Sequence, residues 1–226
     1  MRFQQMRQKL WRAVEAQHRV STLRLVDHNL AEHEALESIL EQSKPPLPEG
    51  AERLHYLLAT PFRYRSRHAS RFRAPQDPGV FYGAAEVRTA CAELGYWRWR
   101  FLRASEGLPA LEAAPHTLFQ ASGEGKTVDL RKAPWRSQRA QWTHPDDYTA
   151  TQALGREVRS AGGEMIVYES VRDPDQGSCT AIFSPRIFHP RRPTAQQTWF
   201  LTVTASAAIW ARERTEFCFR FAEGQA

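Results

Sequence analysis

The sequence predicts an α+β fold in which helices flank a mostly antiparallel sheet. Helical patterns fill much of the first 100 residues, whereas short apolar runs of strand length follow residue 163. The 226 residues contain no internal repeat and no linker that divides them cleanly, so we expect one domain. Within it, residues 1–60 are expected to form a helical N-terminal extension and residues 61–226 the core that carries the chemistry.

Composition places the chain among ordinary globular proteins. It is 42% hydrophobic, with seven Trp and twelve Phe, which is enough to build a sizeable core. No apolar stretch approaches the roughly 20 residues that span a bilayer, and the basic N-terminus lacks the apolar region of a secretory signal. We therefore expect a cytoplasmic protein with no membrane contact.

Charge and cysteine content narrow the classes of partner. A net charge of +6 permits a nucleic acid, an acidic protein or a phosphorylated ligand, and charge alone does not choose among them. The three cysteines are far apart and lack metal-ligand spacing. We expect neither a disulfide framework nor a metal site.

The first half of the chain contains helices interrupted by loops. Residues 9–27 fit a strand about as well as a helix, whereas 29–42 are helical, with Asn29 as the expected N-cap. A proline-rich segment at 44–50 ends this helix, and a short second helix is expected at 51–59.

An arginine-rich loop then leads into a strand and a further helix. The expected strand covers 79–82 and the helix 85–96, after which aromatic and basic residues alternate over 96–101. That alternation is typical of a single-strand nucleic-acid platform, or of an element with one buried and one solvated face. Residues 103–126, rich in Gly, Ala and Pro, are expected to form a long surface loop.

The second half of the chain is rich in strands. A short strand is expected at 128–130 and a helix from His144 to about Ser160, with acids in its first turn. The apolar runs that follow predict the remaining strands, at 165–168, 180–183, 198–203 and 217–221, with a weaker one at 208–211.

The sequence does not contain several common catalytic and nucleotide-binding motifs. Lys126 and Thr127 follow Gly125 as in a phosphate-binding loop, but Gln120 stands where that motif needs its first glycine, and no helix follows. The sequence also lacks GxGxxG after a strand, GxSxG and HExxH.

One stretch, residues 61–93, concentrates groups suited to a phosphate-rich ligand with flat rings. Several guanidinium groups precede an aromatic strand, and Glu93 lies on the following helix one turn after Thr89. The alternative is a solvated basic loop whose charges form structural ion pairs. The guanidinium groups belong to Arg63, Arg65, Arg67, Arg71 and Arg73.

A series of short motifs resembles the RES domain, a family named for its Arg, Glu and Ser residues. The resemblance covers essentially the whole chain, because several separated motifs occur in the family's order. These motifs are Arg63-Tyr64, Arg71-Phe72, Gly79-Val80-Phe81-Tyr82, Thr89-Ala90, Ala92-Glu93 and Tyr168-Glu169-Ser170-Val171-Arg172.

The resemblance implies a fold similar to ADP-ribosyltransferase toxins and a toxin of a type II toxin–antitoxin pair. Such a toxin destroys NAD⁺ by breaking the nicotinamide–ribose bond, with inorganic phosphate or water as acceptor. NAD⁺ is then a substrate, and no prosthetic group is expected. The implied protein partner is an Xre-like antitoxin that plugs the NAD⁺ site, and DNA is reached only through it.

The resemblance also implies site residues. Glu93, Arg71 and Ser170 correspond to the catalytic residues, and the context of Arg71 departs from the family's usual GGRW because Ser70 and Phe72 flank it. Arg63 corresponds to the first family arginine, with Arg12 and Arg65 as rivals. The NAD⁺-binding set is then Arg63, Tyr64, Arg71, Tyr82, Thr89 and Ser170.

The chemistry of these groups agrees with that assignment. A carboxylate stabilises an oxocarbenium-like transition state, arginines hold phosphates, and a tyrosine gives a flat ring a stacking face. Two alternatives stay open: an ADP-ribosyltransferase acting on a macromolecule, and a basic nucleic-acid-binding module. Nucleic-acid binding would weaken steeply with salt and survive Glu93→Gln, whereas NAD⁺ cleavage would not survive it.

Overall fold

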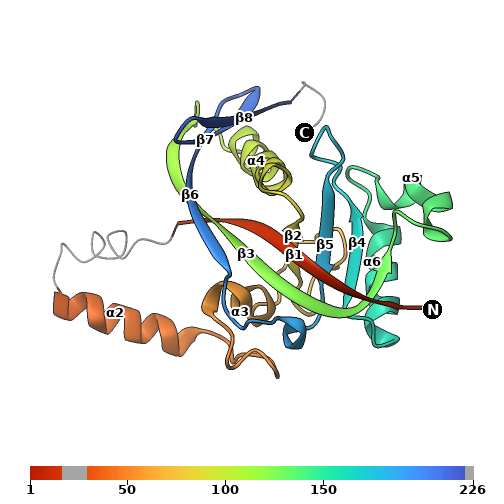
Figure 1. Ribbon diagram of the computed structural model, residues 1–226. Helices are drawn as coiled ribbons and strands as arrows, with labels where there is room; N and C mark the ends of the chain where they lie inside the picture. Colours follow the sequence, from red (N-terminus) through yellow and green to blue (C-terminus); the bar gives the residue numbers. More distant parts are fainter. Residues whose placement is uncertain (17–29, 222–226) are drawn as a thin grey trace.

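A computed structural model describes residues 1–16 and 30–221 and has the predicted α+β fold (Figure 1). Its eight strands form one sheet in the order β1-β2-β5-β4-β3-β6-β7-β8. Neighbouring strands run antiparallel except β3 and β4, which pair in parallel. The expected mostly antiparallel sheet with flanking helices is therefore confirmed.

The long strand β3 (Leu111–Asp129) connects the two halves of this sheet. It pairs along its length with β1 (Gln4–Glu15), from Gln4 opposite Thr127 to Glu15 opposite His116. Its other neighbours are β4 (Met165–Glu169) and β6 (Ala195–Val203). Because β1 also meets β2, the strands β1-β2-β5-β4-β3 close on themselves.

The expectation of a surface loop at 103–126 is wrong from Leu111 onward, and residues 103–104 belong to the helix Val87–Ala104. Gly123 and Gly125 lie inside β3, where they allow a close approach of the short 3-10 helix Pro185–Ile187. A Cβ on Gly123 would lie 3.1 Å from Ile187 Cδ1, and one on Gly125 would lie 2.7 Å from Glu164 Oε2. The expected strand at 128–130 is the end of β3.

The N-terminal region is only partly helical. The expected helical extension is wrong for β1, and the strand alternative for residues 9–27 is right up to Glu15. Helix α2 (Leu30–Ser43) matches its prediction, while Asn29 and residues 17–28 lie outside the described part. Helix α3 (Tyr56–Arg63) begins later than expected, because the His55 ring accepts a hydrogen bond from Leu57 N and caps it there.

The next two elements are β2 (Phe81–Ala84) and helix α4 (Val87–Ala104). The helix is longer than the expected 85–96, so the aromatic–basic run 96–101 is helical. Tyr96 and Trp99 point into the core, each 2% exposed. The run therefore has one buried and one open face and does not form a continuous stacking platform.

The C-terminal strands lie close to their predicted positions. They are β4, β6, β5 (Ser178–Ile182), β7 (Ala207–Arg212) and β8 (Thr215–Arg220). Helix α6 (Thr149–Ser160) starts five residues later than expected. The acids before it lie in a turn, where the His144 ring accepts hydrogen bonds from Asp146 N and Asp147 N.

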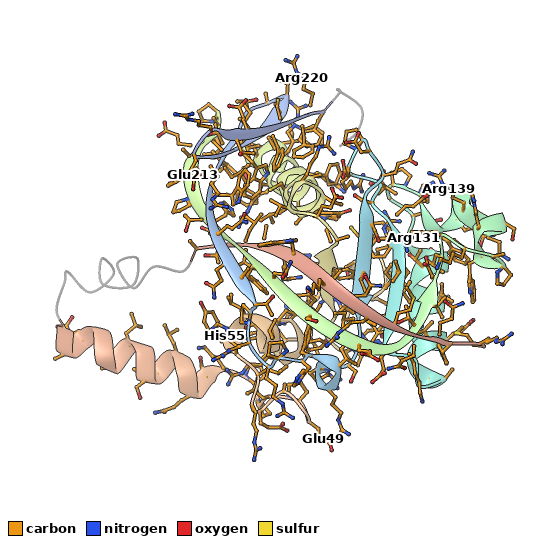
Figure 2. The ribbon with its side chains drawn as sticks, in the orientation of Figure 1. Glu49, His55, Arg131, Arg139, Glu213 and Arg220 are labelled. Atoms are coloured by element: carbon orange, nitrogen blue, oxygen red, sulfur yellow. The ribbon has the colours of Figure 1, made fainter. Side chains whose placement is uncertain are left out.

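Ion pairs attach the short helix α5 (Arg139–Trp142) and the turn after β3 to the sheet. Arg131 and Arg139 lie on the same side of the molecule (Figure 2). Arg131 contacts Asp129 at 2.8 Å, and Arg139 contacts Glu169 at 2.6 Å. Arg131 also donates a hydrogen bond to Ser178 Oγ at 2.8 Å. No helix in 1–16 or 30–221 is long and apolar enough to cross a membrane.

Two hydrophobic clusters meet along α4. One lies beneath α6 and includes Ala90, Tyr168 and Cys179. The other packs Cys91, Ala92 and neighbouring residues of α4 against β6, β7 and β8. Trp11 packs against both clusters, so the junction between them lies beside β1.

The central position of β3 predicts a large effect of truncation there. Leu118 is fully buried, so Leu118→Ala should lower the free energy of unfolding by about 2–5 kcal/mol, through lost burial and a residual cavity. Leu108→Ala, at a 38% exposed position before the strand, should change it by at most about 0.5 kcal/mol. Urea denaturation measures both, and equal effects would contradict the strand assignment.

A buried histidine on β3 predicts a pH-dependent stability. Burial lowers the pKa of His116, which packs against the Trp210 ring at 5.1 Å. The unfolded chain takes up this proton near pH 6.5, at a higher pH than the folded chain, so stability should fall as the pH drops below about 6.5. His116→Phe should flatten that part of the curve of unfolding free energy against pH. An unchanged slope would contradict the assignment.

Candidate active site

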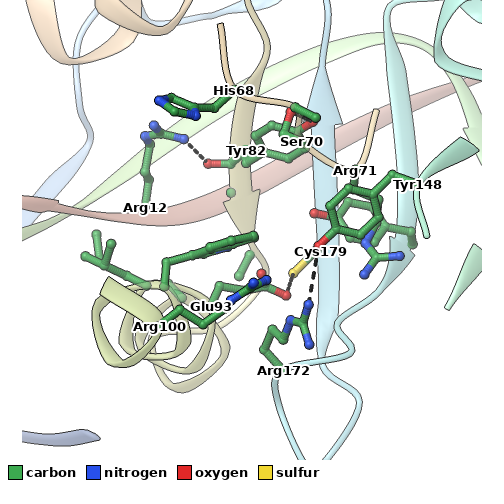
Figure 3. Close-up of a pocket in the computed structure, with 18 of the residues that line it drawn as sticks. Arg12, His68, Ser70, Arg71, Tyr82, Glu93, Arg100, Tyr148, Arg172 and Cys179 are labelled. Atoms are coloured by element: carbon green, nitrogen blue, oxygen red, sulfur yellow. Dashed lines mark hydrogen bonds between the residues drawn. The ribbon is translucent and has the colours of Figure 1, made fainter. Parts of the chain in front are cut away.

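A cavity of about 720 Å³ opens where the two hydrophobic clusters meet (Figure 3). This volume falls within the usual range for small-molecule sites. Its walls come from β1, the loop 68–71, β2, α4 and the ends of β4 and β5, with Tyr148 and Arg172 from two further segments. Segments far apart in the sequence therefore share one cavity.

Glu93 supplies the carboxylate of this cavity from the second turn of α4. Its Oε1 accepts a hydrogen bond from Ser170 Oγ at 2.6 Å. Cys179 Sγ lies 3.8 Å from the same oxygen, as Figure 3 shows. Burial, and then the nearby Glu93 charge, raise the pKa of Cys179 well above its usual value. Cys179 is therefore a neutral thiol, and Glu93 has a fixed orientation.

Ser170 holds both Glu93 and the turn that follows β4. Its side chain is buried, and its Oγ accepts hydrogen bonds from Arg172 N at 3.2 Å and Asp173 N at 3.0 Å. Thr89 does not line the cavity; its hydroxyl donates to Asp173 Oδ2 at 2.7 Å and ties the start of α4 to this turn. Ser170 thus positions Glu93 and the turn after β4, and Thr89 positions that turn against the start of α4.

Arg12 contributes a partly buried cation from β1. It donates a hydrogen bond to Tyr82 O at 2.7 Å, and its guanidinium lies 5.1 Å from the centre of the Phe81 ring. Burial lowers the pKa of Arg12 to about 10, so the group stays protonated at neutral pH. Within the described residues, its buried Nε has no hydrogen-bond partner. A charged guanidinium that lines a cavity and is oriented by a backbone hydrogen bond can hold an anion there.

Arg71 is a buried arginine of the cavity, 8% exposed. It donates to Trp142 O and His144 O, each at 2.9 Å, and stacks over the Tyr148 ring at 4.8 Å. Both bonds come from the same terminal nitrogen, Nη1, and the side chain lines the cavity. The arrangement holds Arg71 in one orientation facing the cavity.

Tyr82 connects the arginine-rich loop to β2. Its hydroxyl lies 2.8 Å from Ser70 Oγ and accepts a hydrogen bond from Phe72 N at 3.0 Å. Burial raises the pKa of Tyr82, so the hydroxyl is neutral. Because Ser70 and Phe72 flank Arg71, these bonds fix the loop despite its departure from the family's GGRW context.

The cavity contains Arg12 and contains neither Arg63 nor Arg65. Arg63 ends α3, and its side chain donates to Pro45 O. Tyr64 is 41% exposed and also lies outside the cavity lining. The structure therefore brings together Glu93, Arg71, Tyr82 and the rival Arg12, with Ser170 directly behind Glu93.

Arg172 is a cavity residue whose role the sequence did not indicate. Its guanidinium lies 3.6 Å from the centre of the Tyr96 ring and 3.6 Å from Asp146. It stands two residues after Ser170 in a motif already recognised, which was the only available signal. Tertiary packing also brings to the cavity residues that the sequence motifs did not indicate as site residues. Among them are His68, Trp97, Arg100, Tyr148 and Cys179.

Comparisons with known proteins agree with this fold. A chain in the crystal structure of the M. tuberculosis MbcT–MbcA toxin–antitoxin complex is similar, with a TM-score of 0.52 and 12% sequence identity. The match covers 87% of this chain and 86% of that chain, and at this identity it shows a shared fold. A comparison with curated proteins gives no match. The family model described as RES domain matches residues 47–203, and the chain therefore belongs to the RES-domain family.

Proposed function

We propose that this protein is a toxin enzyme that degrades NAD⁺ by cleaving the bond between nicotinamide and ribose. The observation that carries the proposal is that one cavity is lined by the Glu93 carboxylate, the partly buried Arg12 and the buried Arg71. Membership of the RES-domain family supports it, as does the fold shared with a chain of a toxin–antitoxin complex.

Glu93 would act on the ribose next to nicotinamide. When the glycosidic bond breaks, its electron pair goes to the pyridinium nitrogen, so nicotinamide leaves as a neutral molecule without needing a proton. Positive charge then develops on the ribose, and a nearby carboxylate stabilises it. The hydrogen bond from Ser170 Oγ leaves Glu93 Oε2 available for a ribose hydroxyl.

Arg12 and Arg71 would bind the phosphate groups of the reaction. Their guanidinium groups are charged and oriented by hydrogen bonds to backbone carbonyls, so little ordering entropy is lost on binding. Tyr82 would offer a ring face to nicotinamide, with its hydroxyl held by the loop.

The acceptor completes the reaction at the ribose carbon. Inorganic phosphate would form a new C–O bond there and give ADP-ribose-1″-phosphate. Water would give ADP-ribose and release one proton, which the Glu93 carboxylate can accept. We propose phosphate as co-substrate because more than one guanidinium lines the cavity.

The proposed biological setting is the cytoplasm, where NAD⁺ is available, with an Xre-like antitoxin as protein partner. The similar solved chain comes from a toxin–antitoxin complex, which supports an antitoxin as partner. In this setting DNA is bound by the antitoxin, and the toxin reaches it only indirectly.

Purified protein should consume NAD⁺, and Glu93→Gln should reduce the rate by about 10²–10³-fold, because it removes transition-state stabilisation. Arg12→Ala and Arg71→Ala should each lower kcat/KM by at least about tenfold, whereas Arg63→Ala should stay near wild type. Mass spectrometry of products with and without phosphate identifies the acceptor.

Circular dichroism and thermal unfolding of each variant serve as the control for folding. Stable NAD⁺ in the presence of folded wild-type protein would overturn the proposed function. Labelled ADP-ribose appearing on a protein or nucleic acid would instead show the transferase alternative. Salt-sensitive nucleic-acid binding that survives Glu93→Gln would indicate the binding-module alternative.

The hydrogen bond from Ser170 to Glu93 predicts a positioning effect. Ser170→Ala should lower kcat more than it raises KM, by about tenfold, because the carboxylate loses its fixed orientation while the cations stay in place. Ser170→Thr, which retains a hydroxyl, should recover part of the rate. A pure KM effect would show that Ser170 contacts the substrate itself.

A further inference from the structure

One wall of the cavity carries side chains that have no role in the proposed reaction at Glu93. It is a single stripe of α4 that begins at Glu93 and continues outward along Leu94, Trp97, Arg100, Phe101 and Ala104. At a rise of 1.5 Å per residue, the eleven-residue step from Glu93 to Ala104 extends about 16 Å along the helix axis. The cavity is therefore elongated along α4 and open beyond the carboxylate.

Two aromatic side chains on this stripe are exposed. Trp97 is 42% and Phe101 52% exposed, whereas Tyr96 and Trp99 on the opposite face of the same helix are 2% exposed. The buried pair accounts for the packing of α4 against β6, β7 and β8. Trp97 and Phe101 thus face the cavity with ring surface that the core does not cover.

Two cations lie next to the Trp97 ring. The guanidinium groups of Arg100 and Arg172 lie 5.6 and 6.0 Å from the centre of the Trp97 ring. Asp146 contacts Arg100 at 3.7 Å and Arg172 at 3.6 Å, so it connects α4 to the turn after β4 (Figure 3 shows both arginines). An aromatic wall beside fixed guanidinium groups suits a flat base linked to a phosphate.

We propose that Trp97 and Phe101 form a second subsite that binds the adenine ring of the dinucleotide. This inference rests on the proposed function and extends it to substrate selection. With the nicotinamide ribose at Glu93, the pyrophosphate would lie near the cavity's guanidinium groups and the adenine would stack on the outer part of α4. The enzyme would then prefer NAD⁺ to nicotinamide mononucleotide, which has the same scissile bond but lacks the adenylate.

The decisive experiment compares the two substrates in wild type, Trp97→Ala and Phe101→Ala. Loss of base stacking should raise KM for NAD⁺ by about 5- to 100-fold with little change in kcat, and leave kcat/KM for the mononucleotide unchanged. Phe200→Ala removes an aromatic that is 47% exposed on β6, outside the cavity, and should affect neither substrate. Equal losses with both substrates would overturn the proposal.

A binding measurement separates this inference from the proposed reaction. Isothermal titration calorimetry with AMP requires no turnover, and Trp97→Ala should weaken AMP binding by the same factor as it raises KM for NAD⁺. If wild type leaves NAD⁺ intact but shows Trp97-dependent AMP binding, the reaction is wrong and the adenine subsite stands. If AMP binds equally to wild type and both variants, or does not bind to wild type, the subsite is refuted.

Discussion

The pairing of β1 with β3 is the constraint on which the rest of the structure depends. It extends from Gln4 opposite Thr127 to Glu15 opposite His116, and with the β1–β2 contact it closes five strands on themselves. The closure brings Arg12 into the cavity, although this residue precedes the segment 47–203 that matches the RES domain. A cation from the start of the chain thus joins a carboxylate from α4.

The second organising feature is the position of α4 between two hydrophobic clusters. Ala90 belongs to one cluster, and Cys91 and Ala92 belong to the other, so the helix is held along two faces. Glu93 follows directly, where the clusters meet, and Ser170 Oγ donates a 2.6 Å hydrogen bond that fixes its carboxylate. Close packing on both sides explains how a charged group keeps one orientation at the base of an open cavity.

Much of the fold was predictable from local sequence patterns. The C-terminal strands consist of apolar, β-branched and aromatic residues between turns, and such runs are reliable signals. The prediction failed at β3, because small residues there serve close packing against Ile187 and suggest a loop when read alone. It also failed to extend α4 past Tyr96, since alternating aromatic and basic residues fit a strand as well as a helix.

The sequence by itself determined the α+β class and contains the RES-type motifs. Those motifs predicted four site residues that the fold places in or next to one cavity: Arg71, Tyr82, Glu93 and Ser170. Only the tertiary structure decided that Arg12 and not Arg63 lines the cavity, and that Thr89 ties α4 to the turn after Ser170. Only the tertiary structure placed Trp97 on the cavity side of α4 and Trp99 in the core. The physical reason is that motifs depend on residue type and order, which are local, whereas a cavity depends on strand register and helix packing between distant segments.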